Sequence, residues 1–271
     1  LSPLGATYSR FIFAAPWIVS FSLIFLLLTN VSIPDLESQF LLFAVGGGLA
    51  QILATVCVIL VFKSRNFAVG ITLKKTEVIL TALVGLILIG EGVSTISMFL
   101  ICLGGAGVFF LSKKVSSVDR SNFSILNKSA VYGLLSGLLF AISAVCYRSA
   151  TLSVVSDLVY LRAGFTLLIV ILSQSFVMTI WLALFEPGQI KLVWLERKKG
   201  FWVGVTSLGG SFFWFTAFTL QNAAYVKAVG QIELIFSLLI TTLFFKERIL
   251  NREILGMLLI GISALGLILV V

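Results

Sequence analysis

Nine apolar stretches dominate the chain, and each is long enough to cross a bilayer as a helix. A hydrocarbon core of about 30 Å needs about 20 helical residues. Apolar and polar residues do not alternate in these stretches as they would in barrel strands, so helices are expected. The sequence therefore predicts an all-α integral membrane protein with nine transmembrane helices present. The stretches are approximately 8–29, 40–62, 69–89, 93–111, 130–147, 154–185, 201–220, 225–245 and 254–271.

The composition agrees with this class and excludes several others. Hydrophobic residues make up 59% of the 271 residues and charged residues 11%, whereas a soluble domain is about one quarter charged. The absence of His excludes a Ser-His-Asp triad, a His proton relay and a His-ligated metal. Cys57, Cys102 and Cys146 lie in apolar runs, so we expect buried thiols rather than disulfides or a zinc site. We expect no metal and no cofactor.

The net charge of +8 is concentrated in short segments between the apolar stretches. This pattern is typical of the positive-inside rule rather than of nucleic-acid binding, so the expected partners are the bilayer and a small molecule. Most basic residues follow the stretches 40–62, 93–111, 154–185 and 225–245. The rule places these four connections in the cytoplasm and the C-terminus outside.

Polar residues also repeat along the chain. At an offset of 156 residues the matching pairs are Asn66 with Asn222, Ala68 with Ala224, Glu77 with Glu233, Glu91 with Glu247, and Gly105 with Gly261. At an offset of 152, Tyr8 matches Tyr160 and Arg10 matches Arg162. Glu and Asn are scarce here, so their matches mean more than apolar coincidences. The alternative is chance similarity between two hydrophobic stretches.

Five spans separate equivalent points of this repeat. Because five is odd, the two copies would lie in opposite orientations, as in the inverted repeats of secondary transporters. We expect a first repeat over 1–111, a connecting loop over 112–129 and a second, five-helix repeat over 130–271. The counterpart of 130–147 would precede Leu1, so we expect an intact protein of ten helices, of which this chain lacks the first.

Two matching segments carry a family resemblance. Residues 222–233 read NAAYVKAVGQIE and continue to FFKER at 244–248; their counterparts are NFAVG at 66–70, KTE at 75–77 and GE at 90–91. Over nearly the whole chain the sequence resembles the EamA-like ten-helix members of the drug/metabolite transporter superfamily.

The resemblance implies a helical bundle whose central cavity is lined by the third, fourth, eighth and ninth helices of the full protein. It also implies that small metabolites are transported by alternating access in the bacterial cytoplasmic membrane, by a monomer or a homodimer. Many relatives have a Pro in the fourth and ninth helices, and this sequence has none in the corresponding stretches, 69–89 and 225–245.

Glu77 and Glu233 are the first candidate functional residues. Each lies about eight residues, or about 12 Å, into its predicted helix, where a charged carboxylate needs a partner or a wet cavity. Desolvation would favour proton uptake by either one. Glu77 has Lys74 three residues before it, which provides an alternative, structural reading, whereas Glu233 has no cation three or four residues away.

The other candidates are polar or aromatic residues within or beside the spans. Each has a structural alternative, such as snorkelling for Lys75, anchoring at the headgroups for Arg10 and Arg162, and lipid contact for Trp214. The set is Lys75, Gln231, Asn66, Asn222, Arg10, Arg162, Tyr8, Tyr160, Gln51 and Trp214.

These observations favour a permease that moves a small polar or amphipathic metabolite outward, with proton coupling through Glu233 as a hypothesis. A passive channel is the first alternative, although no selectivity-filter sequence is evident. An intramembrane enzyme is the second. It is disfavoured because the sequence has no Gly-x-Ser-x-Gly, and because its aspartates, Asp35, Asp119 and Asp157, lie outside the span centres.

Overall fold

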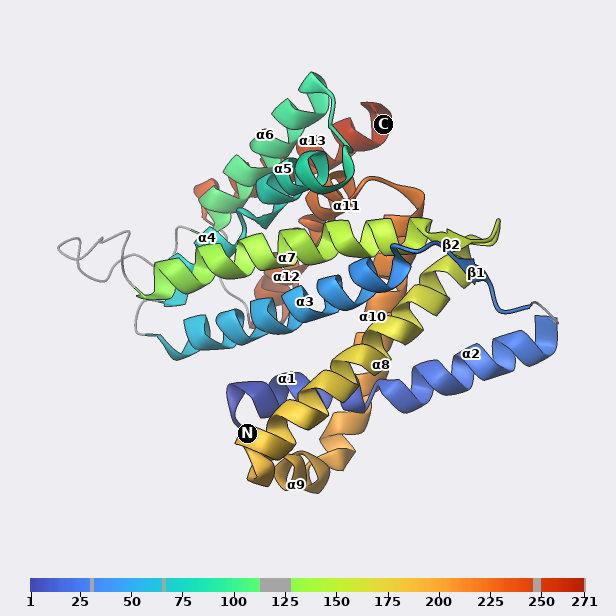
Figure 1. The fold of residues 1–271 in the computed structure, drawn as a ribbon. Helices are drawn as coiled ribbons and strands as arrows, with labels where there is room; N and C mark the ends of the chain where they lie inside the picture. The colour runs from blue at the N-terminus through green and yellow to red at the C-terminus, as the bar shows by residue number, and fades with distance from the viewer. Residues whose placement is uncertain (30–31, 65–66, 113–127, 246–249, 271) are drawn as a thin grey trace. The chain divides into compact units, whose positions relative to one another are not determined.

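The computed structural model describes residues 1–29, 32–64, 67–112, 128–245 and 250–270, and most of these are helical (Figure 1). The chain divides into two compact units. Unit 1 contains Leu1–Val56 and Ile142–Gln221, and unit 2 contains Cys57–Ala141 and Asn222–Val271. Each unit therefore takes residues from both of the predicted repeats.

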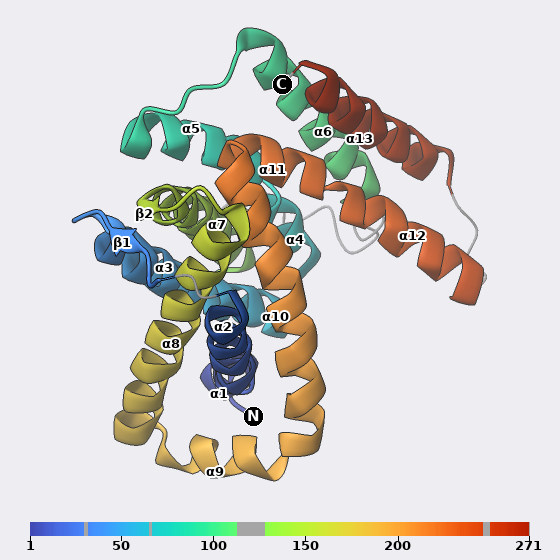
Figure 2. The same cartoon turned by 90° about the vertical axis from the view of Figure 1, so that its right-hand side faces the viewer.

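Unit 1 is built around three packed segments. The helices α1 and α2 pack against α8 and α10, and α9 joins the ends of α8 and α10 (Figure 2). A two-residue antiparallel ladder of β1 and β2, with Asp35 opposite Val155, is the one β-sheet among the described residues. The elements are α1 (Pro3–Ile12), α2 (Ala15–Thr29), β1 (Asp35–Leu36), β2 (Val154–Val155), α8 (Val159–Phe185), α9 (Pro187–Leu195) and α10 (Arg197–Leu220). The helices α3 (Phe40–Lys63) and α7 (Lys128–Leu152) contribute residues to both units.

The start of α1 and its junction with α2 follow from local chemistry. Ser2 caps α1 by accepting a hydrogen bond from the Gly5 N–H at 3.0 Å, and Pro3 follows it at a position where no N–H is needed. The helix stops at Phe13, which lies against Gly200 and Gly204 of α10 so closely that neither glycine has room for a Cβ. The segment predicted as one helix over 8–29 is thus two helices, and the first of them begins earlier, at Pro3.

Unit 2 is centred on two helix pairs. The helices α6 and α13 pack along their lengths (Figure 1), and α5 packs on α11. Gly104 faces Ser263, and Gly107 faces the backbone of Gly256, so small residues allow the close approach that lipid-embedded helices need. The elements are α4 (Phe67–Lys74), α5 (Glu77–Ile89), α6 (Thr95–Ser112), α11 (Ala223–Gly230), α12 (Ile232–Phe245) and α13 (Asn251–Val270).

Two of the predicted spans in unit 2 are interrupted. The segment 67–89 breaks between α4 and α5, and the segment 223–245 breaks between α11 and α12. At the breaks the backbone tightens: the N–H groups of Lys75, Thr76 and Gln231 donate to carbonyls three residues back, at 3.1–3.2 Å. The helices are therefore broken although neither segment contains a Pro.

Seven helices in the described part of the chain are long and apolar enough to cross a membrane. This count joins α1 with α2 and α11 with the start of α12. They indicate a multi-pass membrane protein. Some predicted boundaries are wrong. The helix α8 begins at Val159 rather than at 154, and the polar stretch after Phe185 is largely the helix α9. The predicted loop 112–129 lies almost wholly outside the described residues.

Candidate functional site

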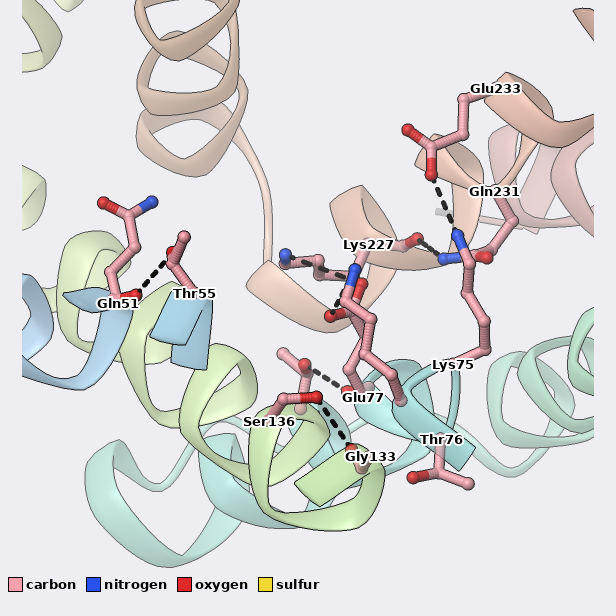
Figure 3. Close-up of polar contacts among 12 residues, drawn as sticks. Gln51, Thr55, Lys75, Thr76, Glu77, Gly133, Ser136, Lys227, Gln231 and Glu233 are labelled. Carbon is pink, nitrogen blue, oxygen red and sulfur yellow. Dashed lines mark hydrogen bonds and ion pairs between the residues drawn. The ribbon is translucent and has the colours of Figure 1, made fainter. Parts of the chain in front are cut away.

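The two helix breaks of unit 2 bring together most of the ionisable side chains within its apolar segments (Figure 3). Lys74 ends α4, Glu77 begins α5, and Lys227 lies in the last turn of α11. Three lysines and two glutamates give this group one net positive charge. We call it the ion-pair cluster; its members are Lys74, Lys75, Glu77, Lys227, Gln231 and Glu233.

Glu77 is the buried centre of the ion-pair cluster, with 5% of the residue exposed. Its Oε2 lies 3.7 Å from Lys74 Nζ and its Oε1 lies 3.9 Å from Lys227 Nζ. Both ammonium groups also lie over the ring of Phe140, at 4.9 and 5.7 Å from its centroid. The predicted Lys74–Glu77 pair is present, and Lys227 adds a second cation from a distant segment.

Lys75 and Glu233 form the second ion pair, with Lys75 Nζ donating to Glu233 Oε1 at 2.9 Å. The Lys75 side chain is 11% exposed and that of Glu233 is 61% exposed, so the pair joins an interior cation to an open carboxylate. As predicted, no cation lies three or four residues from Glu233 along the chain, but a distant residue supplies one. The cation comes from a residue 158 positions away, which helical spacing around Glu233 cannot reveal.

Two acceptor atoms of the ion-pair cluster are buried without a hydrogen bond in the described structure: Glu77 Oε2 and Gln231 Oε1. Gln231 is buried and its Nε2 donates to the Lys227 carbonyl at 3.3 Å (Figure 3). Buried polar atoms normally have partners, so these two are suited to receive a donor from a ligand or a water. Asn222 has a structural role, since its Oδ1 caps α11 by accepting from the Ala224 N–H at 2.8 Å.

Unit 1 contains a separate group of polar side chains within its spans. Gln174, which is 1% exposed, donates to Gln51 Oε1 at 2.8 Å and to the Gly48 carbonyl at 3.1 Å. The Tyr147 hydroxyl also donates to Gln51 Oε1, at 3.0 Å. We call Gln51, Tyr147 and Gln174 the glutamine cluster. Arg10 of α1 forms a separate contact, in which its Nε donates to Ser207 Oγ of α10 at 2.7 Å.

The remaining predicted residues lie in neither cluster. Tyr8 is in the core of unit 1 and accepts a hydrogen bond from Thr179 at 3.0 Å. Arg162 Nε donates to the Thr151 carbonyl at 2.9 Å, which ties the start of α8 to the end of α7. Trp214 packs on Phe218, with ring centroids 5.6 Å apart. Asn66 and Glu247 lie outside the described residues.

Tyr160 lies instead at an apolar cavity of about 820 Å³ between α2, α8 and α10. Aromatic residues such as Trp17, Phe165, Trp202 and Phe212 line it, and none of its lining residues is charged. In a bilayer such a surface suits hydrocarbon, so the cavity is not a polar substrate site.

No group of three or more His, Cys, Asp or Glu residues that could hold a metal occurs in the described ranges. Cys57 and Cys146 are buried thiols as predicted, but Cys102 is exposed on α6.

Sequence reasoning missed Lys227, Tyr147, Gln174 and Ser207. A signal was available for two of them, because a lysine or a glutamine inside an apolar span usually faces a partner. The other two needed the packing between segments, since a hydroxyl within a span commonly bonds its own helix.

Comparison with known proteins identifies the fold and no more. No family model matches the sequence, and no curated protein matches it. A solved structure described only as "Crystal structure of protein" is similar, with a TM-score of 0.72 at 15% identity over 100% of this chain and 90% of that one. At this identity the likeness shows a shared fold alone.

Proposed function

We propose that the chain is a membrane permease, a secondary transporter that moves a small polar or amphipathic metabolite outward by alternating access. One observation carries the proposal. Two helices of unit 2 are interrupted inside apolar segments, and the interruptions hold the ion-pair cluster. Transporters of this kind bind substrate and coupling ions at discontinuous helices, where helix ends and charged side chains meet.

The positions of the helices support an internal repeat. The helix α4 begins at Phe67 and α11 at Ala223, α6 begins at Thr95 and α13 at Asn251, and each pair of starts is 156 residues apart. The first segment, Pro3–Thr29, has the same 27-residue length as α8 and begins 156 residues before it. This offset of the helix starts differs from the offset of 152 at which Tyr8 matches Tyr160 and Arg10 matches Arg162.

This regularity favours two inverted five-helix repeats. With α4–α5 and α6 counted beside the seven long spans, the chain would cross the membrane nine times. An odd number of crossings between equivalent points gives the two copies opposite orientations. The expected setting is a bacterial cytoplasmic membrane, with the protein a monomer or a homodimer.

The Lys75–Glu233 pair suggests how a proton gradient is coupled to transport. Glu233 is the open member of the pair, so a proton can reach its carboxylate more readily than that of buried Glu77. Protonation of Glu233 removes the charge that holds Lys75 and leaves an interior ammonium without its partner. A substrate group would then compete for Lys75 with the Glu233 carboxylate, which re-forms when its proton leaves. This competition links the flux of substrate to the flux of protons.

Glu77 has a different part in this scheme. Two ammonium groups lie within 4 Å of its carboxylate, and they stabilise its charged form. It therefore serves as the fixed anion between Lys74 of α4 and Lys227 of α11. Glu77 Oε2 and Gln231 Oε1, which have no hydrogen bond in the described structure, remain as acceptors for a donor group on the substrate.

The proposal is tested by flux into liposomes that contain the purified protein. A panel of labelled metabolites is supplied with and without an imposed pH gradient, and empty liposomes are the control. A transporter accumulates at least one compound above its external concentration only when the gradient is present. Downhill flux without accumulation would instead identify a passive channel, and chemical conversion of the compound would identify an enzyme.

A further inference from the structure

The apolar cavity of unit 1 extends along α10, between α2 and α8 (Figure 2). Its lining on α10 runs from Phe201 to Phe212, which is about 17 Å along the helix. At one end the Trp17 ring of α2 contacts the Phe201 ring, with centroids 5.3 Å apart. At the other end a Cβ on Gly164 of α8 would lie 3.7 Å from the Phe212 ring. The cavity therefore runs from the start of α10 toward the start of α8.

The cavity is open to the outside of the chain along its length. Phe21, Tyr160 and Trp202 line it, and more than half of each of these residues is exposed. In helices that cross a bilayer, exposed apolar rings meet hydrocarbon rather than water. Lipid can thus enter the cavity from the side.

The length of the cavity matches one leaflet of a bilayer. The hydrocarbon core is about 30 Å thick, so one leaflet contributes about 15 Å. The polar residues 197–200 begin α10, and the apolar lining starts directly after them at Phe201. Counted from Phe201, the lining ends near the middle of the bilayer. The acyl chain of a phospholipid in this leaflet fits both the length and the chemistry of the cavity.

The end of the cavity at the start of α10 carries positive charge. Arg197 and Lys198 are exposed there, and neither forms an ion pair with any residue that the structure describes. Arg197 precedes Phe201 by four residues and Lys198 precedes Trp202 by four, so each cation lies on the same face of α10 as a lining ring. The two cations stand where the headgroup of a lipid in the cavity would lie.

The acidic groups at this end do not neutralise the two cations. Glu196 is paired with Lys199 at 2.8 Å, and Glu186 accepts a hydrogen bond from Ser2 Oγ at 2.6 Å. The segment 186–199 contains four basic and two acidic residues, and four minus two leaves a net charge of +2. An anionic headgroup supplies the missing negative charge, whereas a zwitterionic headgroup brings its own cation.

We infer that the apolar cavity of unit 1 binds one anionic phospholipid, with an acyl chain along α10 and its phosphate beside Arg197 and Lys198. The distribution of basic residues predicts that this end of α10 is cytoplasmic, and the cytoplasmic leaflet is the one rich in anionic lipid. The inference goes beyond the proposed function, because the site uses no residue of the ion-pair cluster and requires no transport.

The test is native mass spectrometry of the full chain in detergent, which measures the affinity for the first bound lipid. The probes are phosphatidylglycerol and phosphatidylcholine with identical acyl chains, so they differ in headgroup charge alone. One variant combines Arg197→Gln with Lys198→Gln. Its matched control combines Lys63→Gln with Lys128→Gln, which removes two exposed cations from α3 and α7, helices that do not line the cavity.

Two neighbouring glycines provide a second comparison. Gly209 lines the cavity and Gly210 does not, and a Cβ on either residue would meet no atom within 4 Å. Gly209→Leu therefore places a side chain where the acyl chain would lie, whereas Gly210→Leu adds the same side chain outside the cavity. Leu favours helix more than Gly does, so both variants are expected to keep α10 folded.

The parent is expected to bind phosphatidylglycerol about tenfold more tightly than phosphatidylcholine, because two cations favour the anionic lipid. The variant without Arg197 and Lys198 should lose this preference, and its control should keep it. Gly209→Leu should bind both lipids about tenfold more weakly, as when roughly two methylenes of the chain lose their burial. Gly210→Leu should bind like the parent.

Equal affinity of the parent for the two lipids would overturn the inference, as would equal binding by Gly209→Leu and Gly210→Leu. A lipid-free dimer that Gly209→Leu dissociates would also overturn it, because a second copy of the chain would then occupy the cavity. If Gly209→Leu does not fold, the variant without the two exposed cations decides: an unchanged preference for phosphatidylglycerol would contradict the site.

Discussion

The two glutamates that match in the repeat differ in their surroundings, and this difference sets their expected roles. Glu77 is 5% exposed and lies between two lysines, whereas the Glu233 side chain is 61% exposed and has one lysine partner. Removing one member of a buried charge pair leaves an uncompensated charge, which costs far more than the loss of an exposed pair. The same chemical change should therefore have different consequences at the two positions.

Glu77→Gln is expected to lower the free energy of unfolding by about 3 kcal/mol, because Lys74 and Lys227 lose their shared anion. Glu233→Gln is expected to lower it by less than Glu77→Gln does, because the Glu233 side chain is 61% exposed and only Lys75 loses a partner. Reversible unfolding in mixed micelles measures both values. Equal losses for the two variants would show that Glu77 is not the buried centre of the ion-pair cluster.

At the scale of elements, the approach of α7 to α4 depends on two glycines. A Cβ on Gly133 would overlap the backbone of Gly70, and a backbone cannot move aside as a flexible side chain can. Other glycines of unit 2 have free space around them, for example Gly261 in α13. The small residues in these helices thus differ in what they contribute to packing.

Gly133→Ala is expected to lower the free energy of unfolding by about 2 kcal/mol through overpacking. Gly261→Ala, with no atom within 4 Å of its new Cβ, is the matched control and should leave stability unchanged or raise it by up to about 1 kcal/mol. Parallel unfolding curves in the same micelles make the comparison. A control that loses as much as Gly133→Ala would contradict the packing of α7 on α4.

The elements also show what the sequence could and could not predict. The long spans followed from run length and composition, because a bilayer imposes a minimum length on an apolar helix. The breaks after Lys74 and Gly230 were missed because no Pro marks them, although the polar residues 74–77 interrupt the apolar run at the first break. Of the ion-pair cluster, Lys75, Glu77, Gln231 and Glu233 were candidates, but Lys227 was not. Pairing between residues 150 or more positions apart depends on packing that helical spacing within one segment cannot show.

At the scale of the whole molecule, the distribution of basic residues predicts the orientation in the membrane. The positive-inside rule places the segment after α6 in the cytoplasm and the segment after α2 outside. In a background without Cys57, Cys102 and Cys146, an impermeant thiol reagent added from outside should modify Ser38→Cys and spare Ser117→Cys. The reverse pattern would show that the orientation does not follow the local charge.

The central claim is that proton movement at the ion-pair cluster drives transport, and accumulation by Glu233→Gln in proteoliposomes tests it most directly. Gln imitates the protonated carboxylate and cannot release a proton, so the variant should still exchange substrate across the membrane but should not accumulate it under a pH gradient. The control is Glu196→Gln, which removes an exposed carboxylate paired with Lys199 at 2.8 Å, and it should accumulate like the parent. Accumulation by Glu233→Gln equal to that of the parent would contradict coupling through this pair.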